Sequence, residues 1–422
     1  MTPFFHMDPK IEAAAARASE LARPQFDKID EITEYNQLKV QKAFIDAGVS
    51  ESHFVASTGY GYDDRGRETL DRVWAQVFGC ESALVRHNFT CGTHTLATAL
   101  FGVLSPGDKM LSVTGTPYDT IHSVIGLSGD NMGSLKDFGV LYEELPLKDG
   151  RVDMDALKTA VDGSVKMVYI QRSRGYSLRP SLSVEEIGRI ADAAKAQNPN
   201  VIVMVDNCYG EFVEKREPTE VGADLVVGSL IKNPGGGIAR TGGYIAGRSD
   251  LVEQCAYRLT TPGLGREVGA TLGFNRELYM GLYFAPHVVG EALRAAVFTA
   301  AFYTQFGYDV TPRYDEARCD IVQSIGLENE ESLVAFCQGI QSGSYIDSFV
   351  APVPWDMPGY DSQVVMAAGA FTLGSSIELS ADAPIRPPYY AWAQGGLTYH
   401  GSKICAMIAA QKLLERGLLK NV

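Results

Sequence analysis

Between Ser57 and Gly247, short apolar runs alternate with stretches of helical periodicity, and this alternation constrains the fold more than any other feature of the sequence. The apolar runs are brief and carry apolar residues at consecutive positions, as strands covered by helices on both faces must. The sequence therefore predicts an α/β sandwich with a mostly parallel sheet. The predicted strands are Ala83–Val85, Lys109–Val113, Val165–Ile170, Val201–Val205, Leu225–Val227 and Gly243–Ala246, and the predicted helices are Gly66–Phe78, Thr93–Leu104, Asp153–Val161 and Val184–Gln197.

The chain has 422 residues, which is too long for one compact core, so we expect a large domain and a smaller one. Residues 1–55 carry a helical pattern too polar for a core and are predicted as an N-terminal arm. Residues 56–285 form the predicted large domain. The remainder, 286–422, mixes patterns and ends in an amphipathic helix over Gly401–Arg416, which predicts a small α+β domain.

Charge and cysteine usage exclude several classes of protein. The net charge of −14 and the pI near 5.0 argue against nucleic acid or an anionic membrane as the main partner. The seven cysteines include no CxxC pair, which indicates reduced thiols rather than disulfides or a zinc site. We find no apolar run long enough for a membrane span and no signal-peptide core. The expectation is a soluble cytoplasmic protein without a metal.

An acid and a lysine follow two consecutive predicted strands. Asp206 ends the run from Val201, and Lys232 follows the strand at Leu225 and precedes the glycines at 235–237. Ligands of open α/β sheets bind beyond the carboxyl ends of the strands. There, Asp206 could keep the ring nitrogen of pyridoxal 5′-phosphate (PLP) protonated, and a lysine of lowered pKa could hold the cofactor as a Schiff base. Alone, Asp206 could be a helix cap or metal ligand and Lys232 a solvated structural residue; their pairing favours the cofactor.

A phosphate site is predicted at the turn Cys91-Gly92-Thr93, which leads into a helix. Small residues there expose backbone N–H groups at a helix N-terminus, where anions bind. The alternative is an ordinary N-cap by Thr93. Ser229, three residues before Lys232, could bind a further phosphate oxygen.

Two more residues are candidates for this site. Tyr118 follows the predicted strand that begins at Lys109 and could stack on the pyridine ring, although an aromatic residue there could simply pack. Arg386 lies between prolines and suits bidentate capture of a substrate carboxylate, with a surface arginine as the alternative. His94 and His122 lack metal-ligand spacing and are predicted to be structural.

These motifs together resemble the methionine γ-lyase-like family of fold-type I PLP-dependent enzymes. Members of the family are often labelled aluminium-resistance proteins or cystathionine β-lyases. The resemblance runs from about residue 30 to the C-terminus. The motifs that carry it are Ser57-Thr-Gly-Tyr60-Gly-Tyr62-Asp-Asp64-x-Gly-Arg67, Gly92-Thr-His94, Gln171-Arg-Ser-Arg-Gly-Tyr176, Val205-Asp206-Asn207, Ser229-x-x-Lys232 and Lys232-Asn-Pro-Gly-Gly-Gly237.

The resemblance implies a carbon–sulfur lyase that converts a sulfur-containing amino acid into a keto acid, ammonia and a thiol. Lys232 would be the base, Tyr118 a second catalytic residue, and Arg172 and Ser173 would bind substrate. An aminotransferase that uses the same residues remains an alternative, as does a non-catalytic, regulatory PLP-binding protein.

The resemblance also implies a homo-oligomer, a dimer or a dimer of dimers (homotetramer), with shared active sites. The better-known γ- and β-lyases use a Tyr-x-Arg element to reach the neighbouring subunit's phosphate, and this chain lacks that element. Tyr60, Tyr62 and Arg67 are its predicted substitutes. Ile231 stands where those enzymes carry a threonine, so one hydroxyl on the phosphate side is missing.

Overall fold

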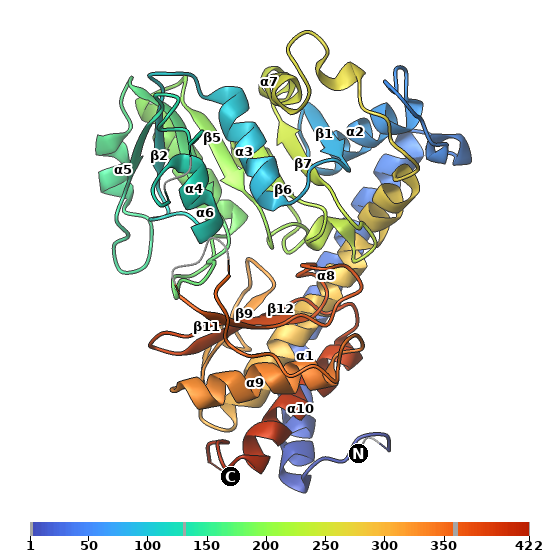
Figure 1. Cartoon of the computed structure of the whole chain (residues 1–422), viewed down its shortest axis with the longest axis vertical. Coiled ribbons are helices and arrows are strands. Elements are labelled where there is room, and N and C mark those ends of the chain that lie inside the picture. Colours follow the sequence, from blue (N-terminus) through green and yellow to red (C-terminus); the bar gives the residue numbers. More distant parts are fainter. Residues whose placement is uncertain (1–2, 130–131, 358–361, 422) are drawn as a thin grey trace. The chain divides into compact units, whose positions relative to one another are not determined.

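The computed structural model describes residues 3–129, 132–357 and 362–421 (Figure 1). The chain divides into two compact units: a large unit of residues 35–284, and a small unit of residues 1–34 and 285–422. The predicted N-terminal arm is thus divided between the two units. Two helices, α1 (Pro9–Asp46) and α8 (Asn275–Thr304), each contribute to both.

The large unit contains a seven-stranded sheet in the order β1-β7-β6-β5-β4-β2-β3. Among these described strands, β7 runs opposite to the other six, so the prediction of a mostly parallel sheet is confirmed. The strands are β1 (Ser82–Arg86), β2 (Lys109–Ser112), β3 (Leu141–Glu144), β4 (Val165–Gln171), β5 (Ile202–Asp206), β6 (Leu225–Ser229) and β7 (Gly243–Gly247).

Helices cover both faces of this sheet, which is why its strands are apolar on both sides. On one face, α3 and α7 pack against side chains such as Leu225 and Val227. On the other face, Trp74 of α2 lies 4.7 Å from Tyr244 between ring centroids. The α-helices of the large unit are α2 (Arg65–Val77), α3 (Gly92–Val103), α4 (Asp119–Ile125), α5 (Met154–Ala160), α6 (Val184–Gln197) and α7 (Ser249–Leu259), and its 3₁₀ helices are η1 (Glu51–Phe54), η2 (Pro218–Val221), η3 (Asn233–Gly235) and η4 (Gly265–Glu267).

Strand alternation decides which residues reach the α3 side of the sheet. Ile202 and Met204 of β5 belong to the core beneath α3, so Asp206, two residues on, shares their face. Asn207 follows with the opposite orientation. In β4, Gln171 is the register partner of Asp206 and shares its face of the sheet. Arg172 follows Gln171 and therefore points to the opposite face.

The predicted strands and helices of the large unit are all confirmed, with ends shifted by at most two residues. The sequence analysis did not predict β3, α4 or α7. Strand β3 lies at the sheet edge with the sequence Leu-Tyr-Glu-Glu, and its largely exposed residues lack the apolar signal of the central strands.

The small unit contains an antiparallel five-stranded sheet in the order β10-β11-β12-β9-β8. Its core combines residues of α1, α8, the sheet and two further helices. The strands are β8 (Asp309–Thr311), β9 (Val322–Gly326), β10 (Val364–Ala367), β11 (Ser380–Pro384) and β12 (Tyr390–Gln394), and the helices are α9 (Glu330–Gly343) and α10 (Tyr399–Glu415), the latter close to the predicted Gly401–Arg416.

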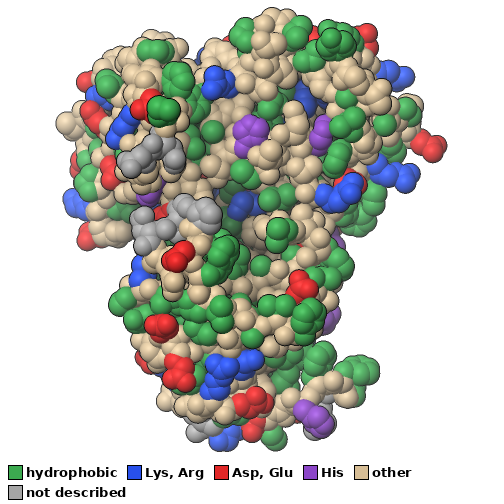
Figure 2. Space-filling view, in the orientation of Figure 1, with side chains coloured by type: hydrophobic (Ala, Val, Ile, Leu, Met, Phe, Trp, Pro, Cys, Tyr) green, Lys and Arg blue, Asp and Glu red, His purple; other side chains and the backbone are tan. Residues whose placement is uncertain are grey.

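The surface carries charges of both signs. On the face drawn in Figure 2, acidic and basic side chains are interspersed with apolar ones. Within the described residues, we find no helix whose length and hydropathy would let it cross a membrane.

We predict that Gly339→Ala destabilises the small unit. A Cβ on Gly339 would lie 2.4 Å from the Cα of Ala409 in α10, which is backbone and cannot move aside alone. Overpacking of this kind costs about 1–3 kcal/mol, although alanine is otherwise the better helix former. Thermal unfolding should show a lower midpoint for this variant. Gly163→Ala, whose Cβ meets nothing within 4 Å, is the control, and equal midpoints for the two variants would contradict the prediction.

Candidate active site

Three segments of the large unit converge at the carboxyl end of the sheet. A Cβ placed on Gly92, the first residue of α3, would lie 3.4 Å from the Cβ of Ser229 and 3.8 Å from the Sγ of Cys208. Ser229 ends β6, and Cys208 lies two residues beyond the end of β5. The N-terminus of α3 therefore lies against the strand ends that carry Asp206 and Lys232, and a Cβ at position 92 would be in ordinary van der Waals contact with them.

Asp206 is buried at the end of β5, with 7% of its surface exposed. Burial raises the pKa of its carboxyl, against the opposing effects of the Cys208 backbone N–H, which donates to Oδ1 at 3.1 Å, and of the Lys232 charge. A buried carboxyl is stabilised in its charged form by a cation. A protonated pyridine nitrogen would be such a cation.

Lys232 lies beside Tyr209, with its Nζ 3.6 Å from the centroid of the aromatic ring. Burial lowers the pKa of Lys232, but Tyr209, Cys208 and Asp206 raise it by more, so the net direction is upward. The lowered pKa was predicted for a lysine beside the cationic cofactor and stays a prediction, since the upward direction comes from the protein's own groups alone. The carboxylate and the aromatic ring stabilise the ammonium form more than burial disfavours it.

Tyr209 is the residue of this site that the sequence analysis missed. Its φ is +73°, a left-handed conformation that costs a non-glycine residue about 1–3 kcal/mol. The turn is closed by the Gly210 N–H, which donates to the Asn207 carbonyl at 2.9 Å. No sequence pattern marks an aromatic residue for this conformation; its position three residues after Asp206 was the only available signal.

The loop of Lys232 is tied to the loop of Tyr209. Asn233 donates from Nδ2 to the carbonyl oxygen of Glu211 at 3.1 Å. The glycines that follow are required by close backbone approach, because a Cβ on Gly235 would lie 1.6 Å from the carbonyl oxygen of Leu230. Ser229 is fully buried, and its Oγ accepts from the Ile231 N–H at 3.2 Å. These contacts fix the turn in which Lys232 lies.

Helix α3 begins at Gly92, and its N-cap is Cys91, whose Sγ accepts from the His94 N–H at 3.4 Å. The alternative prediction of Thr93 as N-cap was therefore wrong. The Thr93 hydroxyl lies 2.8 Å from the hydroxyl of Thr120 in α4 instead. Since α3 is capped by a thiol, a poor acceptor, its N-terminus keeps much of its attraction for an anion.

Tyr118 lies at the same edge of the sheet, directly before α4. Its N–H donates to the Oε1 of Gln171 at 2.6 Å, and Gln171 is the register partner of Asp206. The ring lies edge-on to that of Tyr176, with centroids 5.7 Å apart. Tyr118 is half-exposed, so the geometry brings it to the strand ends without burying it in the core.

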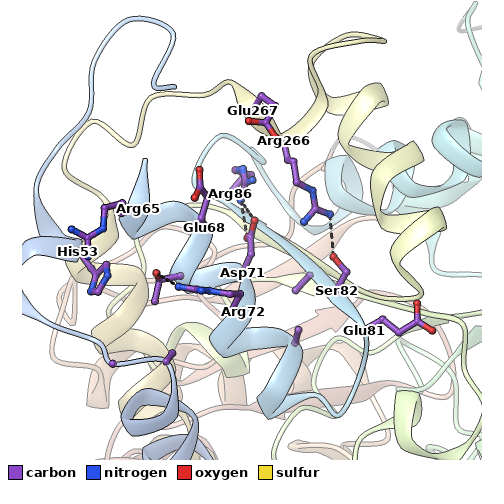
Figure 3. A pocket seen from close by; sticks show the side chains of 15 residues that line it. His53, Arg65, Glu68, Asp71, Arg72, Glu81, Ser82, Arg86, Arg266 and Glu267 are labelled. Atoms are coloured by element: carbon purple, nitrogen blue, oxygen red, sulfur yellow. Dashed lines mark hydrogen bonds and ion pairs between the residues drawn. The ribbon is translucent and has the colours of Figure 1, made fainter. Parts of the chain in front are cut away.

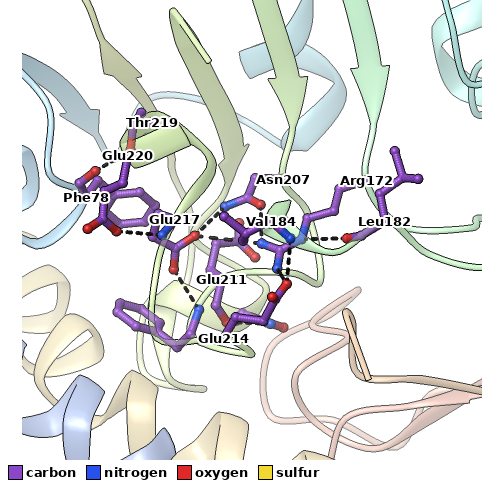
Figure 4. A network of polar contacts seen from close by, with 12 residues as sticks. Phe78, Arg172, Leu182, Val184, Asn207, Glu211, Glu214, Glu217, Thr219 and Glu220 are labelled. Atoms are coloured by element: carbon purple, nitrogen blue, oxygen red, sulfur yellow. Dashed lines mark hydrogen bonds and ion pairs between the residues drawn. The ribbon is translucent and has the colours of Figure 1, made fainter. Parts of the chain in front are cut away.

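Arg172 has no exposed surface and points to the opposite face of the sheet (Figure 4). Its guanidinium donates to Asn207 Oδ1 and to Glu214 Oε1, both at 2.7 Å, and lies 3.8 Å from Glu217 Oε2. It also packs against the Tyr209 turn, because a Cβ on Gly210 would lie 2.5 Å from the Arg172 Cδ. The geometry favours a structural role for Arg172 over the predicted substrate-binding role.

Arg67 likewise binds the chain's own backbone. It is 1% exposed, and its Nη1 donates to the carbonyl oxygens of Gly61 and Gly269 at 2.8 Å each. This contact holds the loop that presents Tyr60 and Tyr62, which are 72% and 56% exposed and stack with ring centroids 5.5 Å apart. The geometry therefore favours Arg67 as a support of this loop rather than as a phosphate ligand, and the role of both tyrosines across a subunit interface stays a prediction.

Two predicted substrate ligands remain. Ser173 is buried, and its carbonyl oxygen accepts from Gln171 Nε2 at 3.0 Å and from Arg179 Nη2 at 2.6 Å. Arg386 is exposed and belongs to the small unit, where the Tyr389 N–H donates to its carbonyl at 2.9 Å. Substrate binding by Ser173 and by Arg386 stays a prediction.

A cavity of about 590 Å³ lies elsewhere in the large unit, beside α2 and β1 (Figure 3). Its lining includes arginines held by acids of the chain itself: Arg86 lies 2.8 Å from Asp71, and Arg266 lies 3.0 Å from Glu253. Neither Lys232 nor Asp206 lines it. The described residues also contain no cluster of His, Cys, Asp and Glu that could hold a metal ion.

A family model, a relative and a solved structure each match nearly the whole chain. The family model for methionine gamma-lyase matches residues 11–414. The uncharacterized Bacillus subtilis protein YnbB is 50% identical over 394 residues, which cover 93% of this chain and 94% of that protein. The crystal structure of a carbon–sulfur lyase involved in aluminum resistance from Clostridium novyi NT superposes with a TM-score of 0.93 at 51% identity, covering 96% of each chain.

A more distant structure shares the fold alone. The pyridoxal-5′-phosphate-dependent protein YhfS from Escherichia coli superposes with a TM-score of 0.62 at 15% identity, covering 92% of this chain and 97% of that one. The fold is therefore that of fold-type I PLP-dependent enzymes, as the sequence analysis predicted.

We predict that Arg172→Met destabilises the large unit strongly. The substitution leaves Glu217 buried without its cation and Asn207 Oδ1 without its donor, and breaking a buried pair costs about 3–5 kcal/mol. Urea unfolding should measure this loss. The control is Arg151→Met. Arg151 pairs with Glu186, but its side chain is 65% exposed, so we expect a loss of unfolding free energy of only about 0–1 kcal/mol. Similar losses in the two variants would refute the structural role.

A pH dependence of stability follows from Glu211. Burial raises its pKa to about 8, against the hydrogen bond from Tyr244, which tends to lower it. The folded protein therefore binds a proton that the unfolded chain releases near the ordinary value of 4.5, so stability falls as pH rises from 4.5 to about 8.

In Glu211→Gln, which mimics the neutral acid, we expect a flatter dependence of the unfolding free energy on pH over that range. Chemical denaturation at several pH values measures it. Glu185→Gln, at an exposed carboxylate of the same unit, should leave the slope unchanged. An unaltered slope in Glu211→Gln would mean that this carboxyl is ionised in the folded protein.

Proposed function

This chain belongs to the methionine gamma-lyase family, a family of PLP-dependent lyases, and on that premise we propose that it eliminates a thiol from a sulfur-containing amino acid, leaving a keto acid and ammonia. The observation that carries the proposal is the convergence of Asp206, Lys232 and the N-terminus of α3 at one edge of the sheet.

The residues at this edge fit PLP. Asp206 supplies a buried carboxyl for the ring nitrogen, and Lys232 supplies the amine for the Schiff base. The α3 N-terminus at Gly92 and the Ser229 hydroxyl next to it suit the phosphate, with Tyr118 beside the ring. When bound, the cofactor acts as an electron sink for the substrate Cα.

The protein's own contribution is acid–base chemistry and positioning. The Nζ of Lys232, once released by the substrate's amino group, is the base for the Cα proton. The Asp206 carboxyl is held by the backbone of Cys208 and is fixed in orientation before any substrate binds. Arg386, from the small unit, is the proposed ligand of the substrate carboxylate.

We further propose that the active protein is a homo-oligomer, in which Tyr60 and Tyr62 of one subunit reach the phosphate of the next. The support is their exposure on a loop that Arg67 holds rigidly.

We predict that Lys232→Ala removes both the imine absorbance of the purified protein and its turnover. No other amine is proposed to form the Schiff base. Absorbance spectroscopy before and after borohydride measures the imine, and release of keto acid measures turnover. The exposed Lys158→Ala is the matched control and should retain both. Normal turnover by Lys232→Ala would contradict the assignment.

The substrate is tested on the wild-type protein with L-methionine, L-cystathionine and L-cysteine in turn. Elimination releases ammonia and a keto acid without any added acceptor. An aminotransferase would release keto acid only when a second keto acid is supplied. A stable imine band with none of these products would identify a non-catalytic PLP-binding protein and overturn the proposed lyase activity.

A further inference from the structure

The aromatic ring of Tyr209 lies in direct contact with the amine of Lys232. The Nζ of Lys232 lies 3.6 Å from the centre of its ring, well inside the range of about 6 Å over which a cation and an aromatic face attract. Among the groups that raise the pKa of Lys232 against the effect of its burial, Tyr209 acts most strongly. Tyr209 is half-exposed, so its ring forms part of the surface on which a ligand of Lys232 would lie.

The backbone holds Tyr209 there in spite of local strain. At φ +73°, glycine would adopt this conformation without cost, whereas a tyrosine persists only when its surroundings fix it. The surroundings do so on the far side of the sheet. Glu217 accepts from the Phe212 N–H at 2.9 Å and from Asn207 Nδ2 at 3.0 Å, which anchors both ends of the turn.

The lysine loop is fixed to the same anchor. Asn233, next to Lys232, donates to the carbonyl of Glu211 at 3.1 Å, and the Glu211 carboxyl in turn accepts from Tyr244 at 2.8 Å. Lys232 and Tyr209 are therefore positioned by one continuous set of buried hydrogen bonds. Strain of this kind, combined with a direct contact to a reactive atom, is typical of functional sites.

We propose that Tyr209 is a further catalytic residue, whose phenol orients the Nζ of Lys232 and stabilises its ammonium form while the lysine carries a proton. The inference rests on the proposed function, because it assigns a partner to the base named there. It adds a residue that neither the sequence motifs nor the family comparison identifies.

The proton balance of the cycle is simple. The neutral Nζ takes the proton from the substrate Cα: the C–H bond breaks, an N–H bond forms, and the electron pair stays with the substrate. The ammonium then lies against the ring and oxygen of Tyr209. It returns the proton to the departing sulfur, which leaves as a thiol, and Nζ becomes neutral again.

The test separates the two parts of the side chain. Tyr209→Phe keeps the ring and removes the oxygen, while Tyr209→Leu removes both. The first measurement uses the ligand-free protein: the rate at which added PLP forms the imine band, followed as a function of pH. Three titratable groups, Asp206, Cys208 and Tyr209, act on the pKa of Lys232. The variants change only the Tyr209 group.

We expect Tyr209→Phe to form the imine faster than the wild type at a fixed pH below the lysine pKa. Loss of the phenol removes a contribution that raises the pKa of Lys232, and each unit by which that pKa falls increases the neutral amine about tenfold. Turnover should change in the opposite direction and fall about tenfold or more, since the ammonium is less well stabilised. Tyr209→Leu should show both effects more strongly.

Opposite changes in the two rates are what a merely structural role would not produce. Tyr257→Phe, at a partly exposed tyrosine of α7, is the control and should leave both rates unchanged. Far-ultraviolet circular dichroism checks that each variant is folded. An imine rate and a turnover in Tyr209→Phe equal to those of the wild type would overturn the inference and leave the proposed function intact. Absence of any imine in the wild type would overturn the proposed function itself.

Discussion

The active-site edge of the large unit depends on one buried interaction, the contact of Arg172 with Asn207, Glu214 and Glu217 on the far side of the sheet. The side chains of Arg172 and Glu217 have no exposed surface, so each requires its partners, whereas the Glu214 side chain is 28% exposed. This charged cluster fixes the course of the chain beyond β5. The turn that carries Cys208 and Tyr209, and through Asn233 the loop that carries Lys232, are both attached to it.

The same cluster explains why acids are buried so close to a reactive amine. Glu211 and Glu217 have no exposed surface, and burial raises the pKa of both carboxyls. Burial disfavours the charged form of each carboxyl, and the charge of Arg172 offsets part of this effect for both. Asp206, on the opposite face, also raises the pKa of Lys232, after the larger effects of Tyr209 and Cys208.

The sequence predicted the fold well because its signals are local and repeated: apolar runs for central strands, helical periodicity between them, and polar residues where strands end. It also predicted that Asp206, Lys232 and the α3 N-terminus lie at one edge of the sheet, because strand ends place them there, while their roles stay predictions. It could not predict Tyr209, because a left-handed backbone at an aromatic residue results from tertiary contacts. The geometry favours a structural role for Arg172, and the motif Gln171-Arg172-Ser173 does not state which face of the sheet each side chain reaches.

The alternation of side chains along β5 limits which changes of strand register the protein can tolerate. Asp206 and Asn207 are neighbours on the chain, yet Asp206 points to the face of the sheet with the proposed cofactor site and Asn207 points to the opposite face, where it donates to Glu217. A shift of β5 by one residue in one direction would put the Asn207 amide where the Asp206 carboxyl lies. A shift in the other direction would put the Asp206 carboxyl where Asn207 lies, beside Glu217. The register of the five-residue strand β5 therefore determines both the position of the proposed cofactor ligand and the packing of the buried polar cluster. A shift of the strand would disturb both.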